Sequence, residues 1–118
     1  MLAERFRWAE LEQLAYSDRR MERRLIGSTL ARIPHELPRP QRARLDAAPA
    51  LDLIAQRIGD ADDQVQKALS WALREWSRVD RTAVGEWLDR QSTLAAATGD
   101  GHRAWVIRDA LAAQTGAT

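Results

Sequence analysis

Apolar residues recur at helical spacing along nearly the whole chain. No stretch alternates between apolar and polar residues as a half-buried strand does. A chain of 118 residues is long enough for one domain with a modest core. The spacing therefore predicts an all-α fold. Six helices are expected, over about residues 3–16, 19–33, 50–58, 62–78, 81–97 and 102–114.

Capping and stop residues set the predicted ends of these helices. Ser17-Asp18, Asp60 or Asp62, and Asp80 offer side-chain oxygens for helix starts. Pro34 and Gly59 are expected to end the second and third helices. The proline-rich connection between those two helices is expected to hold one short turn near residues 41–46.

Each predicted helix has a face that is expected to pack inward. In the second helix, Met21, Leu25, Thr29 and Ile33 are expected to face the core, opposite Arg20, Arg24, Gly27 and Ala31. The small residues Gly27 and Ala31 either let a DNA backbone approach closely or permit tight helix packing. The inward residues expected of the third, fifth and sixth helices are Leu51, Ile54 and Ile58; Val84, Trp87 and Leu88; and Ala104, Ile107 and Leu111.

The first helix is apolar on two sides, which is unusual for a helix with few partners. One side carries Leu2, Phe6, Ala9 and Tyr16, and the other carries Trp8, Leu11 and Ala15. One of these sides is expected to meet another chain, so a homodimer through the first helix is one predicted assembly.

An internal repeat organises the predicted helices into pairs. The acidic turns Ser17-Asp18, Gly59-Asp60 and Gly99-Asp100 each precede a helix, and Arg24, Lys67 and Arg108 follow in register at nearly equal spacing. Two helices per unit at this period are typical of HEAT or armadillo repeats. This predicts a single HEAT-like α-solenoid domain over residues 1–118, with three antiparallel pairs at about 3–33, 50–78 and 81–114. Chance similarity between amphipathic helices is the alternative.

The run Gln66–Trp76 (QKALSWALREW) has two distinct faces when it is wound as a helix. Val65, Leu69, Ala72, Leu73 and Trp76 form a core stripe, whereas Lys67, Trp71, Arg74 and Arg78 lie on the opposite side. A tryptophan among cations can stack on a nucleotide while the cations hold phosphates. Either a neighbouring helix covers Trp71, or Trp71 contacts a ligand.

Composition excludes several classes of site. The formal net charge of +1 requires any basic patch to be local, and the absence of cysteine excludes disulfides and thiol nucleophiles. Asp60, Asp62 and Asp63 resemble a metal cluster, but helix capping explains them better, and His35 and His102 are assigned no chemistry. No metal or other cofactor is expected. The chain has no apolar run of signal-peptide type or of membrane length, so no membrane contact and a cytoplasmic location are expected, with nucleoid association if it binds DNA.

The Gln66–Trp76 run resembles the signature helix of the DNA alkylation repair family, the AlkD-like HEAT-repeat DNA glycosylases. The similarity extends through Val79-Asp80 and Val84, resumes at residues 107–111 (IRDAL), and includes Ser17-Asp18 and Arg23-Arg24 upstream. It spans roughly residues 17–111. The resemblance implies a HEAT-repeat fold and excision of positively charged alkylpurines without flipping the base.

The resemblance also implies roles for individual residues. Trp71 matches an aromatic residue that lines the groove for the damaged nucleotide, Arg24 an arginine near the lesion-side backbone, and Arg74 a DNA-backbone contact. The family's catalytic Asp lies upstream of the segment that matches Ser17, and residues 1–16 contain no matching W-x-x-x-D pattern. The chain thus looks like the C-terminal half of the family fold or a truncated relative, and no catalytic residue is assigned. Glu75 is either a general base or, as an alternative, the salt-bridge partner of a cation on a neighbouring helix.

Two functions from different classes follow from these observations. The first is a module that binds double-stranded DNA through a concave basic face formed by Arg24, Lys67, Trp71, Arg74, Arg78 and Arg108. The alternative is a non-enzymatic helical scaffold that binds protein or self-associates through its first helix. Intact glycosylase activity is a third hypothesis that base release from alkylated DNA would test.

Overall fold

The computed structural model describes residues 2–116 and the side chains of residues 8–112. Within this range the fold is all-α, as predicted, and contains no strand. The helices are α1 (Leu2–Leu14), α2 (Arg20–Glu36), α3 (Arg39–Arg42), α4 (Ala48–Arg57), α5 (Asp63–Ser77), α6 (Arg81–Thr98) and α7 (Gly101–Gly116).

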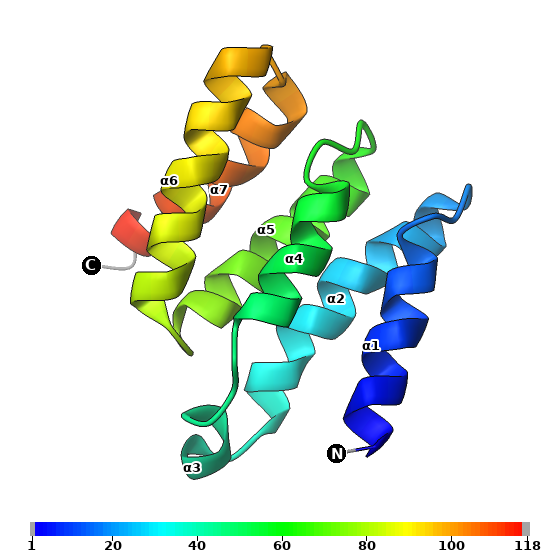
Figure 1. The fold of residues 1–118 in the computed structure, drawn as a ribbon. Coiled ribbons are helices and arrows are strands. Elements are labelled where there is room, and N and C mark those ends of the chain that lie inside the picture. The colour runs from blue at the N-terminus through cyan, green and yellow to red at the C-terminus, as the bar shows by residue number, and fades with distance from the viewer. Residues whose placement is uncertain (1, 117–118) are drawn as a thin grey trace.

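Six of the helices form two layers (Figure 1). α1, α4 and α6 form one layer, and α2, α5 and α7 form the other. In the second layer α2 packs against α5, and α5 packs against α7. α1 contacts α2, α4 contacts α5 and α6 contacts α7 across the layers. The central helix α5 therefore has neighbours on three sides, which explains why it carries the longest run of buried residues.

Two of the predicted helix caps are confirmed. The Asp62 carboxylate accepts hydrogen bonds from the backbone N–H groups of Gln64 and Val65 at the start of α5. Asp80 does the same for Ala83 at the start of α6. The cap predicted at Ser17-Asp18 was wrong, because α2 begins after Arg19 with no side-chain cap, and the Ser17 hydroxyl instead accepts from the Arg19 N–H.

The inward face predicted for α2 is only partly right, because Ile33 packs against the core as predicted but Met21 and Leu25 do not. Met21 and Leu25 are 62% and 50% exposed, while the buried residues are Ile26, Gly27, Leu30, Ala31 and Pro34. The physical reason is the closeness of α5. A Cβ atom placed on Gly27 would lie 2.4 Å from the backbone carbonyl carbon of Ala68, so only glycine fits this crossing. Of the two sequence interpretations of Gly27, tight helix packing is the one that the structure bears out.

Gly27→Ala is therefore expected to destabilise the fold by about 1–3 kcal/mol, because the added methyl group meets backbone that cannot rotate away. This loss should exceed the roughly 1 kcal/mol that alanine gains over glycine inside a helix. Gly85→Ala on α6 is the matched control. Nothing lies within 4 Å of its added methyl group, so it should stabilise the fold. Urea unfolding of both variants measures the contrast, and a stabilised Gly27→Ala would contradict the close packing.

Pro34 lies inside α2 and does not end it, which corrects the predicted stop after Ile33. Proline has no backbone N–H, so the Leu30 carbonyl four residues earlier loses its usual helical donor. The indole Nε1–H of Trp76 donates to that carbonyl at 2.7 Å, and Trp76 is fully buried. A side chain of α5 thus satisfies a backbone acceptor that α2 leaves open.

The remaining inward faces are mostly confirmed. The core stripe predicted for α5 is fully buried, and the residues predicted for α4 and α6 are at most 6% exposed: Leu51, Ile54, Ile58, Val84, Trp87 and Leu88. In α7, Ile107 is buried and Ala104 packs against the core as predicted, but the other buried residues are Val106 and Ala110, and Leu111 is 41% exposed.

Only one of the two apolar sides of α1 faces the core. Leu11 and Ala15 are buried and Trp8 packs on the core, whereas Ala9 and Tyr16 are exposed. The side chains of Leu2 and Phe6 lie outside the described residues. Among the described residues, no helix is long and apolar enough to cross a membrane.

Candidate nucleic-acid interface

A buried carboxylate holds the starts of α2 and α5 together. Arg23 Nε donates to Asp60 Oδ2 at 2.8 Å, and Arg57 donates to the same oxygen through Nε at 3.1 Å and also through Nη2. The Asp62 backbone N–H donates to Oδ1 at 2.9 Å. Burial is the largest influence and raises the pKa of Asp60. The hydrogen bonds from Arg57, Arg23 and Asp62 together outweigh it and hold that pKa below its ordinary value.

A second polar contact joins the starts of α5 and α7. The Gln66 side-chain Nε2 donates to the Asp60 backbone carbonyl at 2.6 Å and lies 3.0 Å from His102 Nδ1. Asp60, Asp62 and Asp63 each form an ion pair with a nearby cation, and Asp62 also caps α5. Within the described part of the chain, no group of three residues is arranged to hold a metal ion.

The stripe predicted on the polar side of α5 differs in burial from residue to residue. Lys67 is exposed and lies 3.8 Å from Asp63, and Arg78 is exposed and lies 3.9 Å from Glu75. Trp71 was expected to lie away from the core, but it is partly buried and packs against the core. Trp71 is nevertheless less buried than the α5 residues on the core side, which are fully buried. Its indole therefore rests on the core and keeps part of its surface open.

Arg74 and Glu75 follow this tryptophan in sequence. Arg74 is partly buried, and its Nε has no hydrogen-bond partner among the described residues. Glu75 is 15% exposed and pairs with Arg78 of the next turn. The pair with Arg78 bears out the salt-bridge interpretation of Glu75, although the partner comes from the same end of α5 and not from a neighbouring helix.

Arg24 and Arg108 are both exposed, on α2 and α7, the two neighbours of α5 in its layer. Arg24 and Lys67 are each the fifth residue of their helices, whereas Arg108 is the eighth residue of α7. A second register is set by the sequence around Trp71. In it Val106 and Ile107 of α7 correspond to Ala72 and Leu73 of α5, all four of them buried, and Arg108 corresponds to Arg74. The two registers differ by seven residues, about two helical turns, so both place the same faces inward.

This alignment brings out a residue that the sequence analysis missed. In this second register Trp105 of α7 corresponds to Trp71 of α5, and it too is partly buried against the core. The sequence does carry the signal, because residues 70–75 read SWALRE and residues 104–109 read AWVIRD. The signal is hidden by its spacing, which is shorter than the period of the acidic turns.

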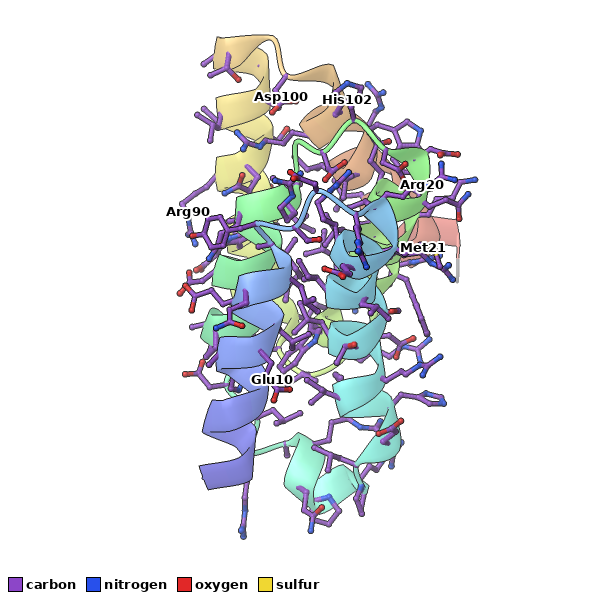
Figure 2. The ribbon with its side chains drawn as sticks, turned by 90° about the vertical axis from the view of Figure 1, so that its right-hand side faces the viewer. Glu10, Arg20, Met21, Arg90, Asp100 and His102 are labelled. Carbon is purple, nitrogen blue, oxygen red and sulfur yellow. The ribbon has the colours of Figure 1, made fainter. Side chains whose placement is uncertain are left out.

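Exposed charges separate between the two layers. On α2, α5 and α7 the exposed cations outnumber the exposed carboxylates five to two, and on the described part of α1, α4 and α6 the carboxylates outnumber the cations five to two. Figure 2 shows Arg20 on one side of the molecule and Arg90 on the other. The first set comprises Arg20, Arg24, Arg32, Lys67 and Arg108 with Glu36 and Asp63; the second comprises Glu10, Glu12, Asp52, Glu86 and Asp89 with Arg81 and Arg90. Among the described residues, the exposed charges thus make the layer of α2, α5 and α7 basic and the layer of α1, α4 and α6 acidic.

Comparison with protein-family models matches residues 1–113 to the DNA alkylation repair enzyme family. Neither the comparison with curated proteins nor the comparison with solved structures gave a match. The family match covers nearly the whole chain and agrees with the resemblance in Gln66–Trp76. A match of this extent supports a function related to DNA repair, and the chain belongs to the family of DNA alkylation repair enzymes.

Proposed function

We propose that this protein binds double-stranded DNA at alkylated purines through the outer face of the layer α2, α5 and α7. In this proposal the three helix pairs form one HEAT-like solenoid domain, and their second helices line a concave face. The family match and the excess of exposed cations on this layer support the proposal. The observation that carries it is Trp71, an indole packed on the core at the centre of that layer, between two turns that bear cations.

Each residue of the proposed face has a chemical role. Arg24, Lys67, Arg78 and Arg108 are exposed and would neutralise phosphates, while the partly buried Arg74 would add positive charge beside Trp71. The open part of the Trp71 ring would lie against the damaged nucleotide. An alkylated purine carries a positive charge, which the negative face of an indole attracts. A rigid ring held by the core needs little ordering to make that contact.

Loss of the two unpaired arginines should weaken DNA binding and its dependence on salt. In the described structure Arg24 and Arg108 are exposed and form no ion pair, so Arg24→Ala with Arg108→Ala should not disturb the fold. Because each phosphate contact releases counterions, the plot of log affinity against log salt should become shallower by about two units. Fluorescence anisotropy with a short duplex at several salt concentrations measures this slope.

The matched control replaces Arg81 and Arg90 by alanine. These are also two exposed arginines outside any ion pair of the described residues, but they belong to α6 in the acidic layer. This control removes the same net charge and should leave the slope close to that of the wild type. Equal slopes for the two double variants would remove the basis for a DNA face on α2, α5 and α7.

Base excision requires its own measurement. A duplex that contains N7-methylguanine is incubated with the protein, and the free base is quantified. Release of the base would assign glycosylase activity to this chain, whereas tight binding without release would assign it a role in recognition alone.

The scaffold function is the second candidate, and one observation favours it. Tyr16, Met21 and Leu25 are 77%, 62% and 50% exposed near the start of α2, and large exposed apolar side chains are typical of protein contacts. A homodimer that uses the outer side of α1 belongs to the same proposal. Sedimentation of the protein alone and with DNA separates this function from DNA binding.

A further inference from the structure

We propose that Trp105 and Arg108 of α7 form a second DNA contact, equivalent to the contact that Trp71 and Arg74 make on α5. This inference rests on the proposed function and extends it along the same face. The first support is in the sequence. The segments 70–75 (SWALRE) and 104–109 (AWVIRD) match in type at every position: a small residue, tryptophan, two apolar residues, arginine and a carboxylate.

The second support is the environment of the two segments. In α5 the apolar residues after the tryptophan are Ala72 and Leu73, and in α7 they are Val106 and Ile107; all four are at most 3% exposed. The tryptophans themselves are both partly buried and pack against the same core. The two indoles therefore have similar settings, each partly buried against the core and partly exposed.

The third support is a hydrogen bond that fixes the two segments relative to each other. The Ser70 hydroxyl donates to Asp109 Oδ2 at 2.6 Å, and it is the direct link between the two motifs. Ser70 precedes Trp71 and Asp109 follows Arg108, so the arginine end of the α7 motif lies beside the tryptophan end of the α5 motif. Arg108 is thereby placed near the turn that carries Trp71, and Trp105 lies about one helical turn away from it.

This arrangement suits a ligand with repeating units. Packed helices lie about 8–10 Å apart, which is the rise of roughly two to three nucleotides along one strand of B-DNA. The two motifs would therefore contact neighbouring stretches of DNA, each through an indole against a sugar or base edge and an arginine on a phosphate. If Trp71 faces the damaged nucleotide, Trp105 contacts undamaged DNA beside it. Its contribution should be the same on damaged and undamaged duplexes.

Trp105→Leu tests the inference, with Trp8→Leu as the matched control. Trp8 is also partly buried and packs on the core, but it belongs to α1 in the other layer. Trp105→Leu should weaken binding to both an alkylated and an unmodified duplex by the same factor, at least about fivefold, as loss of an aromatic contact with nucleic acid does. Trp8→Leu should bind like the wild type. The melting temperatures of the two variants are compared in the same buffer.

A measurement on the wild type keeps the inference testable if Trp105→Leu does not fold. Oxidation of tryptophan by N-bromosuccinimide, followed by mass spectrometry, should show that duplex DNA protects Trp105 and Trp71 but not Trp8. An unprotected Trp105, or a folded Trp105→Leu that binds like Trp8→Leu, overturns the inference. The proposed DNA-binding face would still be supported if the Arg24 and Arg108 double variant shows a shallower slope of log affinity against log salt. If that slope equals the slope of the wild type, both proposals are contradicted.

Discussion

Trp76→Ala is expected to destabilise the protein by about 3–5 kcal/mol, the range for truncating a fully buried tryptophan. A domain of this size is stable by only about 5–15 kcal/mol, so much of the folded population could be lost. Two effects contribute. The substitution leaves a cavity between α5 and α2, and it leaves the buried Leu30 carbonyl without its donor. Denaturant unfolding followed by far-UV circular dichroism measures the loss.

The two effects can be separated with a second substitution. Trp76→Phe keeps most of the apolar volume but removes the indole N–H, so it should cost about 1–3 kcal/mol for the unsatisfied carbonyl. In a Pro34→Ala background, residue 34 gains a backbone N–H that can donate to Leu30. Trp76→Phe should therefore cost less in that background than in the wild type. Equal costs in the two backgrounds would show that the hydrogen bond from Trp76 does not compensate for the missing proline donor.

Asp60→Asn is expected to destabilise the protein by about 3–5 kcal/mol, because removing one partner of a buried ion pair leaves the other charge uncompensated. The Asp60 side chain is 2% exposed, and those of Arg23 and Arg57 are only 16% and 29% exposed. The control is Asp63→Asn. Asp63 is 72% exposed and lies 3.8 Å from Lys67, so its loss should change stability by less than about 1 kcal/mol. Thermal unfolding at neutral pH compares the two variants.

The lowered pKa of Asp60 also leads to a prediction about the stability of the protein in acid. Its pKa in the folded protein lies below the ordinary value of 3.8, so the folded state binds this proton less readily than the unfolded state does. The stabilisation is fully present above that ordinary value, and it is lost as the pH falls below it through the folded-state pKa. The wild type should therefore lose stability in this acidic range, and Asp60→Asn should lose less over the same range. Parallel pH profiles would show that the pKa of Asp60 is the same in the folded and unfolded states, which would contradict the lowered pKa.

The helices that could be predicted well are those with both a strong apolar stripe and a capping carboxylate. In α5, the core side holds Val65, Leu69 and Trp76 against a charged outer side, and Asp62 marks the start. Asp80 and the left-handed Gly99 mark the ends of α6 in the same way. In these helices the local signals agree with the tertiary contacts, so the sequence alone determines the buried face.

The buried face of α2 could not be predicted from the sequence of this helix, because two of its buried residues are its smallest. Gly27 and Ala31 add little apolar character to a helical pattern, while Met21 and Leu25 add much. The structure reverses this order, since a close helix crossing requires small residues and a neighbour that fits them. Only the position of Ala68 on α5 reveals the requirement. The interior proline of α2 is tolerated for a similar reason, because the compensating donor comes from a side chain of α5 that is distant in sequence.

The candidate site was partly predictable. Arg24, Lys67 and Arg108 were expected on one layer, and the structure has all three exposed on α2, α5 and α7. The partial burial of Trp71 was not expected, because a helical wheel gives the direction of a side chain but not how much of it a neighbour covers. Trp105 was missed because the acidic turns set the repeat register, whereas the similar segments SWALRE and AWVIRD match in a register about two helical turns away.

The separation of exposed charges has a consequence for the way the molecule approaches a partner. Among the described residues, exposed cations gather on one layer and exposed carboxylates on the other. This amounts to an electric dipole moment between the layers, even though the net charge of the chain is only +1. In the field of a polyanion such a molecule experiences a torque that turns α2, α5 and α7 toward the negative charge before any contact forms. Orientation during diffusion raises the rate of productive encounters, and added salt suppresses it. In the proposed function, this orientation would help a nearly neutral protein to associate with DNA.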